Sequence, residues 1–278
     1  MLVSIDHVVF SVPADWARKV KVPWELIQKV RAVTVGGIML DIGANIGQTC
    51  VPRILLGDFQ VIHAAEPEPT NYARLETAIQ ANGVSGFVIP ERVAIGSRDG
   101  ALRLRVGHYR SHATVADGDP DSVEVPSLTL DSWIARLGVD PDAISLVKTD
   151  TNGGELDVLR GAAGLLSRRR AIWQIEVAPS LMTRLNTTLG MLTDELRRHF
   201  THFIDINHKA PGDIVRPIDD LTEALAYLDT METSRGGEIT ADRLAVSYPL
   251  KMASIGIRYS RVEASWRLIR ANARRRSV

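Results

Sequence analysis

The segment best suited to bind a cofactor is a glycine-rich turn at residues 41–48, with the sequence DIGANIGQ. It follows the apolar run GGIML and precedes TCVPRILLG, an order that predicts a strand, a turn and a helix. In doubly wound α/β folds, ligands bind beyond the carboxyl ends of the strands, so the turn after the first strand is a cofactor position. We therefore expect residues 41–48 to border a cofactor.

The spacing of this turn excludes two common phosphate-binding motifs. The dinucleotide pattern G-x-G-x-x-G fails because Gly43 is followed two residues later by Asn45. The phosphate-cradling pattern G-x-x-x-x-G-K-[ST] is also absent from the sequence. The turn instead reads D-x-G-x-N-x-G, with Asp41 at the end of the predicted strand. This arrangement suits a cofactor with positive charge and an amino group, and S-adenosylmethionine fits that description.

A second acid, Glu66, lies at the tip of the next predicted strand in the segment HAAEPEP. A carboxylate at this position can accept hydrogen bonds from both ribose hydroxyls, which NAD-binding domains also use. Glu66 therefore predicts a nucleoside without choosing between S-adenosylmethionine and NAD. The choice rests on Asp41 and Asn45, and on the lack of a Y-x-x-x-K pair, since Tyr248 and Lys251 are one residue too close.

Predicted strands and helices alternate from residue 36 to about residue 206. The predicted strands include residues 37–43, 60–67, 144–150 and 171–177, and the predicted helices include residues 47–56, 70–82, 154–168 and 188–200. Strands separated by helices of about 10–15 residues are typical of a parallel sheet covered on both faces. The sequence therefore predicts an α/β fold with a Rossmann-like, doubly wound and mostly parallel sheet.

The two ends of the chain depart from this alternation. Residues 1–35 are predicted to form an N-terminal extension packed on the core, with a hairpin-like or edge element followed by a helix. Residues 36–278 form the main domain, interrupted at about 207–250 by an insertion that is too long for a simple turn and serves as a lid or an accessory lobe. A last strand at 252–260 and a basic helix at about 261–276 are expected to follow.

Composition narrows the classes of partner. Lys plus Arg and Asp plus Glu number 33 each, so the global charge indicates neither nucleic acid nor an anionic membrane surface as partner. The lone cysteine, Cys50, excludes disulfide frameworks and cysteine-based zinc sites. No apolar run approaches about 18 residues, and the N-terminus lacks a signal-peptide pattern. We expect a cytoplasmic protein with no membrane span, which can assemble as a homo-oligomer.

Several motifs in fixed order give the chain a family resemblance between about residues 36 and 206. They are MLDIGANIGQT, AAEPEPTNYARLETAIQANG, ERVAIGSRDGALRLRV, VEVPSLTLDSWI, LVKTDTNGGELDVLRGAAGLL and IWQIEVAP. With these motifs the chain resembles the FkbM-type methyltransferases, which are similar to class I S-adenosylmethionine-dependent enzymes. The resemblance implies an O-methyltransferase acting on a sugar or on a hydroxyl of a secondary metabolite.

The resemblance also implies roles for individual residues. The methionine part of the cofactor is expected beside Asp41 and the turn that follows it, and the ribose beside Glu66. The adenine is expected beside Pro67, Val93 and Ala94. The turn residues concerned are Gly43, Ala44, Asn45, Gly47 and Gln48.

The acceptor side carries candidate catalytic carboxylates. Methyl transfer requires an aligned acceptor oxygen and removal of its proton. Asp150 and Glu176 end adjacent predicted strands, where the acceptor is expected to lie. The family usually reads D-V-E-G after the fourth strand, whereas this chain has Asn152 in place of the second acid. Asp150, Asn152 and Glu176 together also suggest a site for a hard divalent ion such as Mg²⁺.

The remaining candidate residues have two interpretations each. Lys148, inside the predicted strand, either pairs with an acid or contacts the substrate. His112, like His108 in the same polar loop and His208, is either a base with a pKa near neutrality or a solvated loop residue. Glu155 either contributes to the site or forms a capping box with Asn152 at the start of a helix.

The C-terminal segment 261–276 is rich in arginine, with Glu263 as its single acid. It is either a solvated helix face or a positively charged surface that attracts an anionic acceptor.

The leading hypothesis is an S-adenosylmethionine-dependent O-methyltransferase with a small-molecule or glycan acceptor. Alternatives are a non-catalytic cofactor-binding module and an NAD-dependent oxidoreductase. Nucleic-acid methylation is disfavoured because KTDTNGG lacks the N/D-P-P-Y type of motif that holds a flipped base.

Overall fold

The computed structural model of the chain describes residues 1–105, 112–113, 122–204, 206, 215–226, 228 and 241–246. His108, His208, the predicted strand at 252–260 and the predicted basic helix at 261–276 lie outside these residues. The interpretations that concern them therefore stay predictions.

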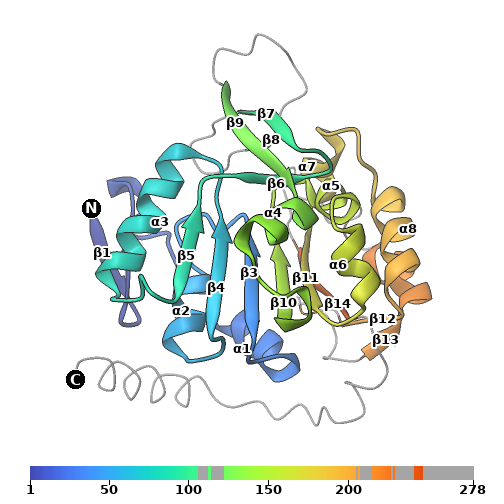
Figure 1. Ribbon diagram of the computed structural model, residues 1–278, viewed down its shortest axis with the longest axis horizontal. Coiled ribbons are helices and arrows are strands. Elements are labelled where there is room, and N and C mark those ends of the chain that lie inside the picture. The colour runs from blue at the N-terminus through green and yellow to red at the C-terminus, as the bar shows by residue number, and fades with distance from the viewer. Residues whose placement is uncertain are drawn as a thin grey trace.

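A single large sheet forms the centre of the molecule (Figure 1). Within the described residues it has eight strands in the order β13-β12-β14-β11-β10-β3-β4-β5. The five neighbours from β11 to β5 are parallel, and β14 runs antiparallel to both β11 and β12. Their bounds are β3 (Ile38–Ile42), β4 (Val61–Ala65), β5 (Val88–Glu91), β10 (Ile144–Thr149), β11 (Ile172–Val177), β12 (His202–Ile204), β13 (Val215–Pro217) and β14 (Ala241–Val246). The prediction of a doubly wound, mostly parallel sheet is confirmed.

Helices cover both faces of this sheet because the buried strands are apolar on both sides. In β3, Met39 belongs to one core cluster, whereas Leu40 and Ile42 belong to the other. The first cluster includes side chains of α1, α2 and α3, and the second includes side chains of α4, α5, α6 and α8. The helices are α1 (Trp24–Val33), α2 (Cys50–Leu55), α3 (Pro69–Ala81), α4 (Leu130–Leu137), α5 (Glu155–Arg160), α6 (Ala163–Arg168), α7 (Pro179–Thr183) and α8 (Leu189–His199).

The chain order places a topological switch point between β3 and β10. From β3 the chain moves outward to β4 and β5, and it then returns to the other side of β3 to form β10 and β11. At such a point the loops that leave neighbouring strands turn toward opposite faces of the sheet, which leaves room for a ligand. The turn at 43–48 and the loop at 150–154 therefore meet at this position.

A smaller sheet lies above the carboxyl ends of the parallel strands in Figure 1. Its strands are β6 (Ala94–Gly96), β7 (Gly100–Arg105), β8 (His112–Ala113) and β9 (Ser122–Thr129), in the order β6-β9-β7-β8. Strand β9 runs directly into α4, where the Thr129 hydroxyl accepts a hydrogen bond from Ser132 N and caps the helix. This cap fixes the junction between the small sheet and the helical layer.

The predicted helix at 154–168 is two helices, so the sequence interpretation was wrong at this point. The chain breaks between α5 and α6 at Gly161 and Ala162. A β-carbon at position 161 would lie 2.0 Å from the carbonyl oxygen of Gly96 in β6. Gly161 O also accepts a hydrogen bond from Asp131 N at 3.0 Å. A close approach between backbones, invisible in the local pattern, therefore ends the first helix.

The N-terminal residues form a separate hairpin and not an edge strand of the main sheet. Strands β1 (Leu2–Ile5) and β2 (Val8–Ser11) pair antiparallel, and β2 packs on α3. The Asn82 side chain accepts from Val9 N at 3.0 Å and donates to Val9 O at 2.7 Å. The hairpin is thus tied to the end of the helix that follows Glu66.

Part of the predicted insertion belongs to the main sheet. Strands β13 and β14 both fall within residues 207–250, and β14 inserts between β11 and β12. Among the described residues, no helix has the length and apolar character needed to cross a membrane.

A buried ion pair stabilises the end of α2. Arg53 Nε lies 2.6 Å from Asp58 Oδ2, and both side chains are fully buried. Arg31 Nε contacts the other Asp58 oxygen at 2.6 Å, and the Arg53 guanidinium lies over the Phe59 ring. Burial lowers the pKa of Arg53 to about 10, and the charge of Asp58 opposes this shift.

We expect Asp58→Asn to lower the free energy of unfolding by about 3–5 kcal/mol, because it leaves a buried guanidinium without its carboxylate. Urea unfolding measures this change. Asp194→Asn is the control, since its carboxylate is 69% exposed beside Arg197 and such pairs contribute about 0–1 kcal/mol. Equal losses in the two variants would show that the buried carboxylate of Asp58 contributes no more to stability than an exposed one.

Candidate functional site

The turn at 43–48 is held across the ends of three neighbouring strands. Gly43 N and Ala44 N both donate to the Ala65 carbonyl of β4, at 2.9 and 3.0 Å. On the other side, Asp150 N donates to the Ile42 carbonyl at 3.0 Å, which joins the end of β10 to β3. The predicted cofactor turn and the predicted acceptor-side loop are therefore in direct backbone contact.

The close contact between the turn and the backbone of Asp150 requires glycine at position 43. Its φ is +76°, and a β-carbon there would lie 1.9 Å from the carbonyl oxygen of Asp150. Asn45 also has a left-handed backbone, with φ of 51°, a conformation that asparagine tolerates better than most residues. The backbone conformation of the turn therefore gives a structural reason for glycine at position 43 and for asparagine at position 45.

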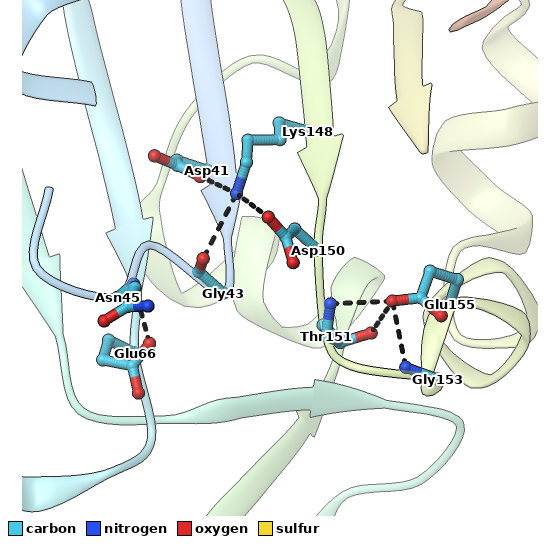
Figure 2. A network of polar contacts seen from close by, with 9 residues as sticks. All are labelled: Asp41, Gly43, Asn45, Glu66, Lys148, Asp150, Thr151, Gly153 and Glu155. Carbon is cyan, nitrogen blue, oxygen red and sulfur yellow. Dashed lines mark hydrogen bonds and ion pairs between the residues drawn. The ribbon is translucent and has the colours of Figure 1, made fainter. Parts of the chain in front are cut away.

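Glu66 is a buried carboxylate that orders the turn, and Figure 2 shows its contact with Asn45. Its Oε2 accepts from Asn45 N at 2.8 Å and its Oε1 accepts from Glu68 N at 3.0 Å. Burial raises the pKa of Glu66 to about 7, although both hydrogen bonds oppose the shift. Each carboxylate oxygen has a second lone pair, so the group can still accept from hydroxyls.

The predicted adenine residues lie next to Glu66. Glu66 N and Val93 N both donate to the Glu91 carbonyl at 3.1 Å, which places the ends of β4 and β5 side by side. Val93 and Ala94 are buried, and Pro67 is half-buried. The structure therefore brings the predicted ribose and adenine residues together.

Lys148 connects the turn to the acceptor side (Figure 2). Its Nζ lies 3.0 Å from Asp41 Oδ1 and 3.6 Å from Asp150 Oδ2, and it donates to the Gly43 carbonyl at 3.2 Å. The prediction that Lys148 pairs with an acid is confirmed. The side chains of Asp41 and Lys148 are 0% and 5% exposed, whereas that of Asp150 is 37% exposed. Asp150 is therefore the carboxylate of this network that a ligand can reach.

The loop at 150–154 is organised by Glu155. Its Oε1 accepts from Thr151 N at 2.7 Å, Thr151 Oγ1 at 2.9 Å and Gly153 N at 3.4 Å. The side chain is fully buried, and burial, with the charge of Asp150, raises its pKa. These contacts hold the loop in a fixed conformation.

The predicted capping box of Asn152 and Glu155 was wrong. Helix α5 begins at Glu155, and its N-cap is Gly154 with no side-chain cap. Asn152 has a φ of 55°, and asparagine adopts this left-handed backbone conformation more readily than most residues. The backbone therefore gives a local reason for an asparagine at this position. The replacement of the usual family acid by Asn152 is therefore explained in part by backbone conformation.

Glu176 lies where it was predicted, on the strand beside Asp150. Strands β10 and β11 are parallel neighbours, with Thr149 opposite Ile175. Glu176 is 6% exposed, so it is a largely buried member of this edge.

Gln174 is a further buried polar residue beside Lys148. It lies opposite Lys148 in the register and is 2% exposed, and its Nε2 has no hydrogen-bond partner among the described residues. A glutamine within the apolar run IWQIEV was the signal that could have identified it.

The donor set does not support the suggested Mg²⁺ site. Among the described residues, no group of three or more His, Cys, Asp or Glu side chains is arranged to hold a metal ion. Asp150 faces the Lys148 ammonium, and a nearby positive charge opposes binding of a divalent cation. The described residues therefore do not support Asp150, Asn152 and Glu176 as ligands of a metal ion.

Two other predicted residues lie in unexpected surroundings. The Gln48 side chain donates to the Lys21 carbonyl at 2.7 Å, so it connects the turn to the N-terminal extension. No sequence pattern indicated this contact. The backbone of His112 belongs to β8 and pairs with Arg105 in the small sheet.

We expect Gly43→Ala to weaken S-adenosylmethionine binding at least tenfold, because the added methyl group overlaps the Asp150 carbonyl and separates the two loops. Calorimetry measures the Kd. Gly83→Ala is a matched control, since Gly83 also has a positive φ of +65° but has no atom within 4 Å of the added carbon. An equal change in both variants would show that backbone strain alone is responsible.

Glu66 gives a prediction for the pH dependence of stability. Its pKa is raised from 4.5 to about 7 in the folded protein, so the ionised group destabilises the fold. The penalty is absent below pH 4.5, grows up to pH 7 and is complete above pH 7. Relative to Glu66→Gln, the wild type should lose up to about 3 kcal/mol of unfolding free energy between pH 4.5 and pH 8.

Urea unfolding over this pH range measures the loss, and Glu25→Gln controls for the change in total charge because Glu25 is 65% exposed. A difference between wild type and Glu66→Gln that stays constant across the range would contradict the buried-carboxylate account.

Comparison with solved structures gives matches at low identity and with TM-scores below 0.5. Methyltransferase FkbM from Methylobacillus flagellatus KT has 18% identity and a TM-score of 0.38, covering 51% of this chain and 32% of its own. The precorrin-6y C5,15-methyltransferase from Geobacter metallireducens GS-15 has 11% identity and a TM-score of 0.43, covering 88% and 98%. M. jannaschii TYW2 in complex with AdoMet has 15% identity and a TM-score of 0.36, covering 86% and 83%.

Comparison with curated proteins found no match. The family model of the methyltransferase FkbM domain matches residues 41–203, which is more than half of the chain. The matched range begins at Asp41 and includes Glu66, Lys148, Asp150 and Glu176. The protein belongs to the FkbM family of S-adenosylmethionine-dependent methyltransferases.

Proposed function

We propose that this protein transfers the methyl group of S-adenosylmethionine to a hydroxyl of a sugar, a glycan or a secondary metabolite. The observation that carries the proposal is the position of Asp150. Its partly exposed carboxylate lies at the carboxyl edge of the sheet and is joined to the cofactor turn by Lys148. A reachable carboxylate beside the methyl donor can orient an alcohol and accept its proton.

The described residues fit the cofactor. Glu66 can accept the ribose hydroxyls, with Pro67, Val93 and Ala94 beside the adenine. The turn from Gly43 to Gln48 would border the methionine part, and Asp41, buried and paired with Lys148, would support the start of this turn. When bound, S-adenosylmethionine supplies an activated methyl group on a sulfonium.

The acceptor is proposed to lie over the ends of β10 and β11. Methyl transfer to oxygen requires the acceptor to be held close and in line, which accounts for much of such rate enhancements. Asp150 would accept the hydroxyl proton, a contribution of about 10²- to 10⁴-fold. Glu176, largely buried at the end of the neighbouring strand, would add a second carboxylate next to Asp150 on the acceptor side.

A second candidate is a cofactor-binding module without catalysis, and Asn152 favours it. The family usually has an acid at this position, and an amide cannot accept a proton there. The left-handed backbone at position 152 also explains the asparagine, without any loss of catalysis. Methyl transfer therefore remains the leading proposal. Family membership disfavours the NAD-dependent oxidoreductase.

Purified protein should bind S-adenosylmethionine in calorimetry and transfer labelled methyl to a compound in a pool of glycans and small hydroxylated metabolites. Asp150→Asn should lower kcat by about 10²- to 10⁴-fold and change the Kd of the cofactor by less than about threefold, because the carboxylate acts on the acceptor.

Asp157→Asn, in a side chain that is 49% exposed on α5, is the control and should retain turnover. Cofactor binding without transfer to any acceptor would favour the non-catalytic module. Full turnover in Asp150→Asn would remove Asp150 from the mechanism.

A further inference from the structure

We propose that Lys148 is a positioning residue that couples the cofactor turn to the acceptor-side carboxylate. One ammonium group would hold the methyl donor's turn and Asp150 in a fixed relation. The inference rests on the proposed function and deepens it, because it explains how donor and acceptor groups from separate loops stay aligned.

Three contacts of Lys148 come from different parts of the site (Figure 2). Asp41 belongs to β3, Gly43 is the first residue after that strand, and Asp150 follows β10. Lys148 itself is on β10, directly opposite Asp41 in the parallel register. Its side chain therefore crosses the switch point and contacts both loops that leave it.

The distances and burial give the three contacts unequal roles. Asp41 is fully buried and lies closest to the ammonium, so this pair anchors the lysine. The Gly43 carbonyl accepts from Nζ at 3.2 Å, which ties the turn to the anchored group. Asp150 is farther away, at 3.6 Å, and partly exposed. Lys148 would therefore orient Asp150 while the Asp150 side chain, 37% exposed, stays accessible to an acceptor.

A backbone contact makes the coupling specific. Gly43 packs so closely on the Asp150 carbonyl that no side chain fits between them. A shift of the turn would thus move the backbone that carries the Asp150 carboxylate. The ammonium contacts the same two residues and would oppose that shift.

The test must separate positioning from a loss of folding. Lys148→Met alone leaves the Asp41 carboxylate buried without its cation, which is strongly destabilising. The comparison is therefore Asp41→Asn against the double variant Asp41→Asn, Lys148→Met. In Asp41→Asn the asparagine oxygen can still accept from the ammonium, which also keeps the Gly43 carbonyl and Asp150 as partners. The double variant has no isolated buried charge at these positions. Urea unfolding and circular dichroism would establish that both proteins are folded.

The first readout is the Kd of S-adenosylhomocysteine. This ligand has an uncharged sulfur in place of the sulfonium. Repulsion between the sulfonium and the Lys148 ammonium therefore does not affect the comparison. The double variant should bind it about tenfold more weakly than Asp41→Asn, because the Gly43 carbonyl has lost its donor. Equal affinities would overturn the link between Lys148 and the turn.

The second readout is a double-mutant cycle on kcat. Adding Lys148→Met to Asp41→Asn should lower kcat about 10-fold or more when Asp150 is present, and less than about threefold when Asp150 is already Asn. Equal losses in both backgrounds would overturn the proposal while the methyltransferase function stands. Wild-type protein that binds no S-adenosylmethionine would instead refute the proposed function.

Discussion

A buried ion pair between neighbouring strands joins the parts of this site. Asp41 on β3 and Lys148 on β10 face each other with their charged atoms 3.0 Å apart, in a sheet that is otherwise largely apolar. Burying two charges is costly, and a pair of hydrophobic residues would often stabilise a core equally well. The pair is better understood through its position, because it lies where β3 and β10 release the two loops that form the site.

Glycine contacts bring the loops close enough for this arrangement. Gly43 allows the cofactor turn to pack on the backbone of Asp150, and Gly161 allows α5 to end against Gly96 of the small sheet. In both places the space for a side chain is occupied by a carbonyl oxygen. The main sheet, the helical layer and the small sheet above it are therefore connected through direct backbone contacts.

Local patterns were sufficient to predict much of the fold and the position of the site. Alternating strands and helices predicted the parallel sheet, and strand-end acids predicted that Asp41, Glu66, Asp150 and Glu176 lie near one edge. Contacts between distant segments left no local pattern. The break at Gly161 depends on Gly96, the Gln48 contact depends on Lys21, and β14 reaches its place beside β11 from within a segment read as an insertion. These features depend on tertiary packing, which a period of 2.0 or 3.6 residues does not encode.

S-adenosylmethionine is proposed to bind in front of Asp150, at the edge formed by the 43–48 turn and Glu66. A crystal structure with S-adenosylhomocysteine is the decisive measurement. We expect ribose hydroxyls within hydrogen-bond distance of Glu66, the amino acid part along Gly43 to Gln48, and the sulfur facing the space beside Asp150. A nucleoside bound away from Glu66, or a sulfur directed away from Asp150, would contradict it.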